Sequence, residues 1–140
     1  MTHQNKLNVC GFTLGSEILF CLNGNVLMNF SKNNVGRVQI RSTMANLLSY
    51  LLSNSGRKYI LDDEIMSNVW EVNNLQASSH RLWQVARDLR FKLREIGLET
   101  ELFTRAQRRG FSVNKDLVMP IYCEDTMGVR KDADSFYASR

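Results

Sequence analysis

The sequence predicts an α+β fold in which antiparallel strands come first, helices follow, and a β-hairpin comes last. Short apolar runs separated by turn residues fill residues 6–41, and apolar residues at helical spacing fill residues 42–96. Two extended segments then flank a basic turn. With 140 residues, of which 44% are hydrophobic and 23% are charged, the chain is long enough to bury one ordinary core.

The first 41 residues predict three or four antiparallel strands. Segments such as FTLG, ILFCL, VLMNF and VQI are short and rich in Val, Ile, Leu and Phe, and turn signals such as NGN and SKNNVG separate them. Runs of about five such residues between turns of this kind are typical of β-hairpins.

Two helices are predicted next. The apolar residues of STMANLLSYLLSNSG predict a helix over residues 43–54, with Ser42 as its N-cap and Gly56 beyond its end. In LDDEIMSNVWE three acids, which interact favourably with a helix N-terminus, precede apolar residues at helical spacing: Ile65, Met66, Val69 and Trp70. A catalytic role for these acids has little support, because no His or metal-ligand spacing accompanies them.

A third and longer helix is predicted from Ser78 or Ser79, either of which can act as N-cap, to about Ile96. One stripe of this helix is apolar and is expected to pack on the core: Leu82, Val85, Ala86, Leu89, Leu93 and Ile96. The opposite face mixes cationic, hydrogen-bonding and aromatic side chains: His80, Gln84, Arg87, Phe91 and Arg94, flanked by Trp83 and Arg90.

The segment LETELFTRAQRRGFSV predicts a β-hairpin around a basic turn, with Gly110 supplying unusual backbone angles. The order strands, helix, helix, loop, basic helix and basic hairpin is that of a winged helix-turn-helix. In this arrangement the third helix, about residues 79–96, enters the major groove of DNA, and the wing, about residues 102–113, reaches the minor groove or the backbone.

We therefore expect a winged-helix DNA-binding domain over residues 6–115. Residues 116–140 are expected to form a tail, with one edge strand and then a flexible or juxtamembrane linker.

Basic charge is concentrated in the predicted third helix and wing. The net charge of the chain is +4, but residues 78–115 hold nine Lys or Arg against four Asp or Glu, a net charge of +5. Such asymmetry indicates a surface for a polyanion. A solvated helix face with i, i+4 ion pairs is the alternative explanation.

Three cysteines, Cys10, Cys21 and Cys123, are an odd number without CxxC spacing, so neither a disulfide framework nor a zinc site is predicted. They indicate a reduced, cytosolic setting. The N-terminal residues lack the features of a signal peptide, and no stretch approaches the about 20 apolar residues that span a bilayer. We expect a cytoplasmic protein without cofactors or metal ions.

Five segments carry a family resemblance: LGSEILFCLNGNVLMN, LLSYLLSNSGR, EIMSNVW, SSHRLWQVARDLRFKL and FTRAQRRGFSV. In this order they resemble the opening sheet, first helix, Trp-ending segment, recognition helix and wing of the C-terminal effector domain of OmpR/PhoB-type bacterial response regulators, in its ToxR/CadC-like branch. The resemblance covers about residues 11–113. Leu61 departs from the pattern where a Ser or Thr commonly caps the second helix, a role that Asp62 can take over, and Arg105 stands where the wing often has Thr.

The resemblance implies transcription regulation by sequence-specific binding of double-stranded DNA. A first set of residues would face the major groove, where such side chains pair with guanine or adenine edges: His80, Arg81, Gln84 and Arg87. Contacts to phosphates are implied for Trp83, Arg90 and Arg94, and wing contacts for Arg105, Arg108 and Arg109. Solvent exposure is the alternative for His80 and the wing arginines, and covering of the core is the alternative for Trp83.

The resemblance also implies partners beyond DNA. Family members bind paired half-sites as dimers or multimers. In OmpR-like proteins the loop before the recognition helix can touch RNA polymerase, here through Val72, Asn73, Asn74 and Leu75, although an ordinary helix connection is the alternative. In ToxR-like proteins a transmembrane helix follows this domain. The chain would then be the cytoplasmic part of a membrane-anchored activator at the inner membrane, with a membrane-anchored co-regulator, or else a stand-alone regulator.

A protein-interaction module and an enzyme are the alternatives to DNA binding. A winged-helix protein-interaction module without DNA binding would use Trp83 and Phe91, but it would not need so many cations on one side. An enzyme has the least support, because the chain has only His3 and His80 and lacks a nucleophile elbow, a phosphate-binding Gly loop and metal-ligand spacing. We expect no catalytic residues.

Overall fold

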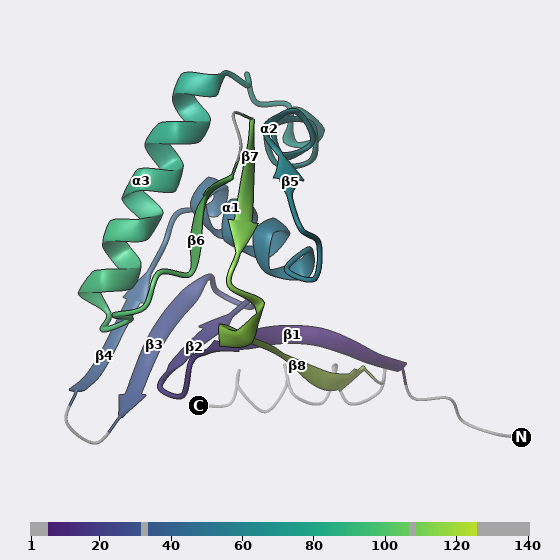
Figure 1. Cartoon of the computed structure of the whole chain (residues 1–140). Helices are drawn as coiled ribbons and strands as arrows, with labels where there is room; N and C mark the ends of the chain where they lie inside the picture. Colours follow the sequence, from purple (N-terminus) through teal and green to yellow (C-terminus); the bar gives the residue numbers. More distant parts are fainter. Residues whose placement is uncertain (1–5, 32–33, 107–108, 126–140) are drawn as a thin grey trace, which may run out of the picture.

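The computed structural model describes residues 6–31, 34–106 and 109–125. An antiparallel sheet forms the base, and the helices and a small second sheet stand on it (Figure 1). Strands, helices and hairpin follow one another in the predicted order. The α+β winged-helix fold predicted from the sequence is therefore confirmed.

The base is a five-stranded sheet of order β4-β3-β2-β1-β8 in which all neighbours are antiparallel. Its strands are β1 (Lys6–Leu14), β2 (Ile18–Cys21), β3 (Val26–Ser31), β4 (Asn34–Gln39) and β8 (Val118–Asp125). The NGN signal makes the turn between β2 and β3, where Gly24 has φ 89° and Asn25 has φ 52°. Gly and Asn adopt such angles more readily than other residues.

Strand β8, which follows the wing, returns to the first strand of the chain. It pairs with β1 from Lys6↔Asp125 to Leu14↔Val118. A disulfide joins Cys10 to Cys123 across this pair, 113 residues apart, and Cys21 remains a free cysteine. The prediction that the cysteines form no disulfide is therefore wrong. The spacing of cysteines along a chain does not reveal a pairing that depends on two distant strands being neighbours.

The first helix, α1 (Ser42–Ser53), contributes six buried residues to the core that the base sheet also lines: Met44, Ala45, Leu47, Leu48, Leu51 and Leu52. Arg41 holds the N-cap position and makes no side-chain capping bond. The prediction that Ser42 caps this helix is wrong, because Ser42 is the first helical residue and not the residue before it.

The second helix is short and irregular. Helix α2 (Asp62–Ile65) continues into the π-helical turn η1 (Met66–Trp70) and the 3-10 turn η2 (Glu71–Asn73). Leu61 holds the N-cap position, and its N–H donates to Glu64 Oε1 at 3.0 Å. The expected capping by Asp62 is not made, because the carboxylate of Asp62 is bound by Arg105 instead.

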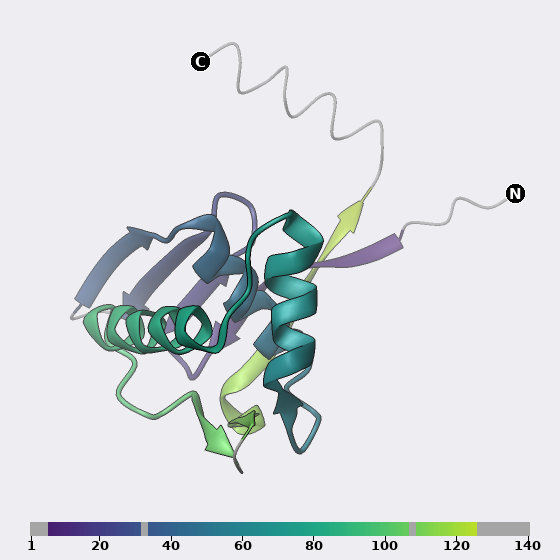
Figure 2. The same ribbon diagram turned by 90° about the horizontal axis from the view of Figure 1, so that it is seen from above.

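The third helix is α3 (Ser79–Glu95), and Ser78, one of the two predicted N-cap candidates, caps it: its Oγ accepts a hydrogen bond of 3.1 Å from Arg81 N–H. Its apolar stripe faces the core: Leu82, Ala86, Leu89 and Leu93 are buried, Ile96 beyond its end is buried, and Val85 is half-buried. Figure 2 shows α3 running across the direction of α2 and η1.

The wing belongs to a second sheet of order β5-β7-β6. Strands β6 (Phe103–Ala106) and β7 (Gly110–Val113) form the predicted hairpin, whereas β5 (Ile60–Leu61) is too short for a sequence pattern to reveal. Gly110 does not have a positive φ, so the expected unusual backbone angles are wrong. Gly110 instead allows β7 to approach β5 closely, since an added Cβ would lie 3.1 Å from the carbonyl oxygen of Ile60 on β5.

Candidate nucleic-acid interface

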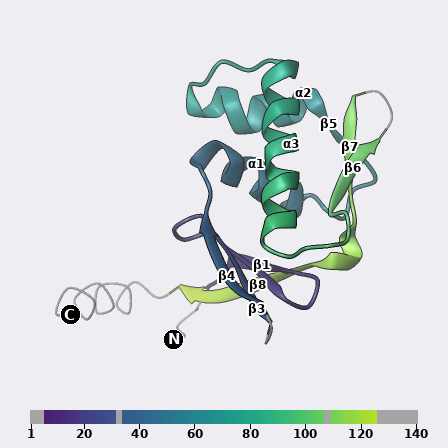
Figure 3. The ribbon, with the colours of Figure 1, turned by 90° about the vertical axis from the view of Figure 1, so that its left-hand side faces the viewer.

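The outward face of α3 presents the predicted groove-facing side chains together. His80, Arg81, Gln84 and Arg87 are all exposed. The Arg87 side chain is 74% exposed, and its nearest acid is Asp88, at the limiting distance of 4.0 Å. Figure 3 shows α3 in front of the other elements, with the wing on one side of it. Because the apolar stripe of α3 packs on the core, the opposite face of the helix presents cationic and amide groups to solvent.

The flank of α3 that faces the wing carries arginines that already have partners. Arg90 Nη2 donates to the Phe103 carbonyl at 3.2 Å, and the Arg90 guanidinium lies 4.7 Å from the Phe103 ring centre. The Glu101 carboxylate lies 3.6 Å from Arg90 Nε and 3.4 Å from Arg94 Nη2. Both arginines that the sequence assigns to phosphate contacts thus share one acid, which partly neutralises this flank.

Arg105 is also paired. Its Nη1 and Nη2 donate to the two carboxylate oxygens of Asp62 at 2.8 and 3.0 Å. The Asp62 side chain is only 9% exposed, so the ion pair is largely removed from water. The Arg105 guanidinium also lies 4.6 Å from the ring centre of Phe111 and 5.5 Å from that of Trp83.

The wing is tied to α2 by main-chain contact as well, because Asp62 N–H donates to the Arg109 carbonyl at 2.7 Å. The Arg109 side chain is exposed. Arg108, which the sequence places beside it at the hairpin tip, lies outside the described residues. Of these two arginines, the structure describes only Arg109.

A cleft separates α3 from the wing. It has a volume of about 230 Å³ and is lined by Trp83, Ala86, Arg87, Arg90, Arg105 and Phe111. Trp83, 54% exposed, stands on its α3 side. The cleft thus brings three guanidinium groups together with two aromatic rings. Of the three arginines, only Arg87 lacks a close acidic partner within the described part of the chain.

The loop after η1 presents part of the predicted polymerase-contact set. Val72 is 69% exposed and Leu75 is 38% exposed, and the N–H of Leu75 donates to the Trp70 carbonyl. Asn74 has a left-handed backbone with φ 60°, and Asn73 Nδ2 donates to the Val69 carbonyl at 2.8 Å. The two asparagines therefore shape the loop, and Val72 is its most exposed apolar side chain.

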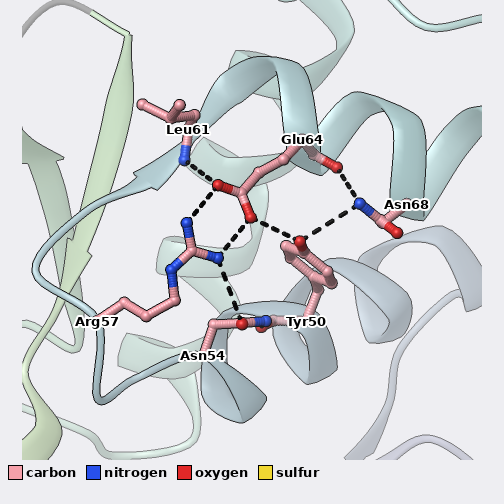
Figure 4. A network of polar contacts seen from close by, with 6 residues as sticks. All are labelled: Tyr50, Asn54, Arg57, Leu61, Glu64 and Asn68. Atoms are coloured by element: carbon pink, nitrogen blue, oxygen red, sulfur yellow. Dashed lines mark hydrogen bonds and ion pairs between the residues drawn. The ribbon is translucent and has the colours of Figure 1, made fainter.

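Two of the three acids at the start of α2, Asp62 and Glu64, make structural contacts. Figure 4 shows Glu64 at the centre of a network, where its carboxylate accepts from Arg57 twice, at 2.6 Å each, and from the Tyr50 hydroxyl at 2.7 Å. The hydrogen bonds from Arg57 lower the pKa of Glu64 to about 2. Burial and the bond to Glu64 raise the pKa of Tyr50. This network joins α1 to α2.

Within residues 6–31, 34–106 and 109–125, no group of three or more His, Cys, Asp or Glu is arranged to hold a metal ion. Over the same ranges, no helix combines the length and the apolar character needed to cross a membrane.

Two acids that matter for this surface are not predicted from the sequence. The sequence favours helix capping for Asp62 and indicates no role for Glu101. Asp62 pairs with Arg105, 43 positions later in the chain, and Glu101 pairs with Arg90 and Arg94 across the turn that follows α3. No local pattern in the sequence marks either contact.

The base sheet, the three helices and the wing define a winged-helix domain. Among solved structures the chain is similar to the DNA-binding domain of Escherichia coli CadC, with a TM-score of 0.60 and 19% sequence identity over 86% of this chain and 100% of that chain. At this identity the similarity concerns the fold. No family model matches the sequence, and no curated protein matches it.

Proposed function

We propose that this chain is a transcription regulator that binds double-stranded DNA in a sequence-specific manner. Helix α3 lies in the major groove, and the wing contacts the minor groove or the backbone. The observation that carries the proposal is the line of exposed His80, Gln84 and Arg87 on one face of α3, beside a wing that presents Arg109. The similarity to a CadC DNA-binding domain supports it at the level of the fold.

The groove-facing side chains have the chemistry to distinguish bases. An arginine such as Arg87 can donate two hydrogen bonds to guanine O6 and N7, and a glutamine such as Gln84 can pair with adenine N6 and N7. His80 and Arg81 lie in the first turn of α3 and add hydrogen-bond donors at the N-terminus of the helix, which enters the groove. In this proposal these four residues read sequence.

Backbone contacts come from the flank and from the wing. Trp83, Arg108 and Arg109 contact phosphates, and Arg90 and Arg94 do so by exchanging Glu101 for phosphate. Each phosphate neutralised contributes about −0.9 to the slope of log affinity against log salt concentration. Because Glu101 competes for two of these arginines, the slope should be smaller than the number of basic residues alone would suggest.

The remaining partners are proposed on the resemblance. The chain binds paired half-sites as a dimer or multimer in the cytoplasm, and Val72 is the residue through which the loop would touch RNA polymerase. Anchorage at the inner membrane and a membrane-anchored co-regulator belong to the same proposal. A reducing cytoplasm would act on the Cys10–Cys123 disulfide, so DNA binding should be measured with and without a thiol reductant.

A second function is favoured by one observation. Phe91 is 60% exposed on the outward face of α3. Near it, Lys92 pairs with Glu95 at 3.7 Å and Arg94 pairs with Glu101. An exposed aromatic side chain with neutralised charges nearby also suits a protein-interaction module.

One experiment separates the two functions. Fluorescence anisotropy of a labelled mixed-sequence duplex is measured at several salt concentrations with the native chain, Arg87→Ala and Lys115→Ala. Both variants lose one positive charge, but Lys115 lies at the start of the 3-10 turn (Lys115–Leu117) that leads into β8. We expect only Arg87→Ala to weaken binding strongly, by about tenfold. Equal effects of the two variants, or no binding at low salt, would contradict the proposal.

A further inference from the structure

The sequence places Arg105 among the DNA-contacting residues, but its surroundings assign it another role. We propose that Arg105 is a positioning residue, held by Asp62, which fixes Trp83 against the wing so that Trp83 contacts the DNA backbone. Arg105 itself does not contact phosphate. This inference rests on the proposed function and specifies which side chain at the cleft meets DNA.

The geometry of the ion pair supports this role. Both terminal nitrogens of Arg105 are engaged by the Asp62 carboxylate, at 2.8 and 3.0 Å. This fork-to-fork arrangement is the one that fixes an arginine most firmly. If a phosphate took Arg105 away, the carboxylate of Asp62 would stay buried without its partner, and breaking a buried pair in this way is strongly unfavourable.

The pair brings together residues of four elements. Asp62 begins α2, Arg105 lies on β6 of the wing, and the rings near the guanidinium belong to Trp83 on α3 and Phe111 on β7. The main-chain bond from Asp62 N–H to the Arg109 carbonyl reinforces the same junction. Arg105 is therefore placed to set the angle between the helix and the wing.

Trp83 has the properties of the residue that is being positioned. Trp83 is 54% exposed and lines the cleft together with Arg87, one helical turn further along α3. An indole N–H can only donate a hydrogen bond, which suits a phosphate oxygen. An aromatic side chain whose orientation is already fixed loses little conformational entropy on binding.

The inference and its alternative give opposite signs for one substitution. Asp62→Asn keeps the shape of the side chain and raises the net charge from +4 to +5. If Arg105 were a phosphate ligand, its release would strengthen DNA binding. If Arg105 is a positioning residue, Asp62→Asn should weaken binding by about tenfold despite the added charge. Asp63→Asn is the matched control, because Asp63 is exposed and adjacent and its loss changes the charge equally.

Substitutions of Arg105 test the same point through the salt dependence. Arg105→Lys retains the charge but loses the planar fork, whereas Arg105→Met loses both. A positioning role predicts that both variants weaken binding with an unchanged salt slope, because no phosphate contact is lost. A ligand role predicts that Arg105→Met alone reduces the slope, by about 0.9.

Trp83 supplies a spectroscopic readout that loss of stability alone would not change. The chain has two tryptophans, and Trp70 is buried, so acrylamide quenching reports mainly on Trp83. We expect DNA to protect Trp83 from quenching in the native chain and much less in Arg105→Met at saturating DNA. Thermal unfolding of each variant identifies any that do not fold, and the comparison then uses Arg105→Lys.

The outcomes separate the two levels of the proposal. If the native chain does not bind the duplex, the proposed function fails. If the native chain binds but Asp62→Asn binds as tightly as Asp63→Asn, or if Trp83 gains no protection, the function stands and the positioning role of Arg105 is overturned.

Discussion

Asn29 Nδ2 donates a hydrogen bond of 2.7 Å to the carbonyl oxygen of Ile96, 67 residues later in the chain. Asn29 lies on β3 and is 1% exposed, and Ile96 is the C-cap of α3. The last turn of a helix leaves carbonyl groups without helical partners. The base sheet thus supplies, through one side chain, the partner for the end of the helix that carries the candidate interface.

We expect Asn29→Leu to lower the free energy of unfolding by about 2–3 kcal/mol, because the buried Ile96 carbonyl loses its partner. Urea unfolding followed by circular dichroism measures the change. Asn68→Leu is the control, since Asn68 Nδ2 makes a bond of the same length, 2.7 Å, to the Glu64 carbonyl at an exposed position. Equal losses for the two variants would show that burial does not set the energy of the Asn29 bond.

Stability should depend on pH through Glu64. Its pKa is lowered from 4.5 to about 2, chiefly by the hydrogen bonds from Arg57. Because the folded pKa lies below the unfolded one, the stabilisation is complete above pH 4.5 and is lost as pH falls from 4.5 towards 2. After allowance for solvent screening we expect a contribution of about 1–2 kcal/mol.

Unfolding by urea at pH 6, 4 and 3 tests this dependence in the native chain and in Glu64→Gln. The variant should be less stable at pH 6, and the difference between the two proteins should shrink at pH 3. A constant difference across this range would exclude Glu64 as a source of the pH dependence.

Reduction of the disulfide should destabilise the fold. The Cys10–Cys123 bond spans 113 residues and fixes β8 to β1. A crosslink over so long a loop restricts the unfolded chain and is worth about 2–5 kcal/mol. We expect dithiothreitol or Cys123→Ser to lower the melting temperature by several degrees.

Two controls accompany this measurement. Cys21→Ser removes the free cysteine and should leave the effect of dithiothreitol intact. Cys123→Ser should be insensitive to dithiothreitol. Persistence of the reductant effect in Cys123→Ser would show that the effect comes from elsewhere in the chain.

The sequence predicted the parts of the fold that depend on local pattern. The capping of α3 by Ser78, the apolar stripe through Leu82 and Leu89 and the turn at Gly24 each follow from residues within a few positions of one another. Strand β5 and the Cys10–Cys123 bond were missed for a common reason. Each exists only because segments distant in the sequence become neighbours in a sheet.

The same distinction applies to the candidate site. Exposure of His80, Gln84 and Arg87 follows from the helical period, and these residues lie where the sequence places them. The state of the other arginines does not follow from a period. Arg105 is bound by Asp62, 43 positions earlier, and Arg90 and Arg94 share Glu101. A count of basic residues therefore overstates the free positive charge of the surface.

The most direct test of the central claim is a nuclear magnetic resonance titration of the ¹⁵N-labelled chain with a mixed-sequence DNA duplex. We expect the largest amide shift changes along the outward face of α3 and in the wing, and few changes in the base sheet. No shift changes at low salt, or changes confined to the base sheet, would contradict DNA binding through α3 and the wing.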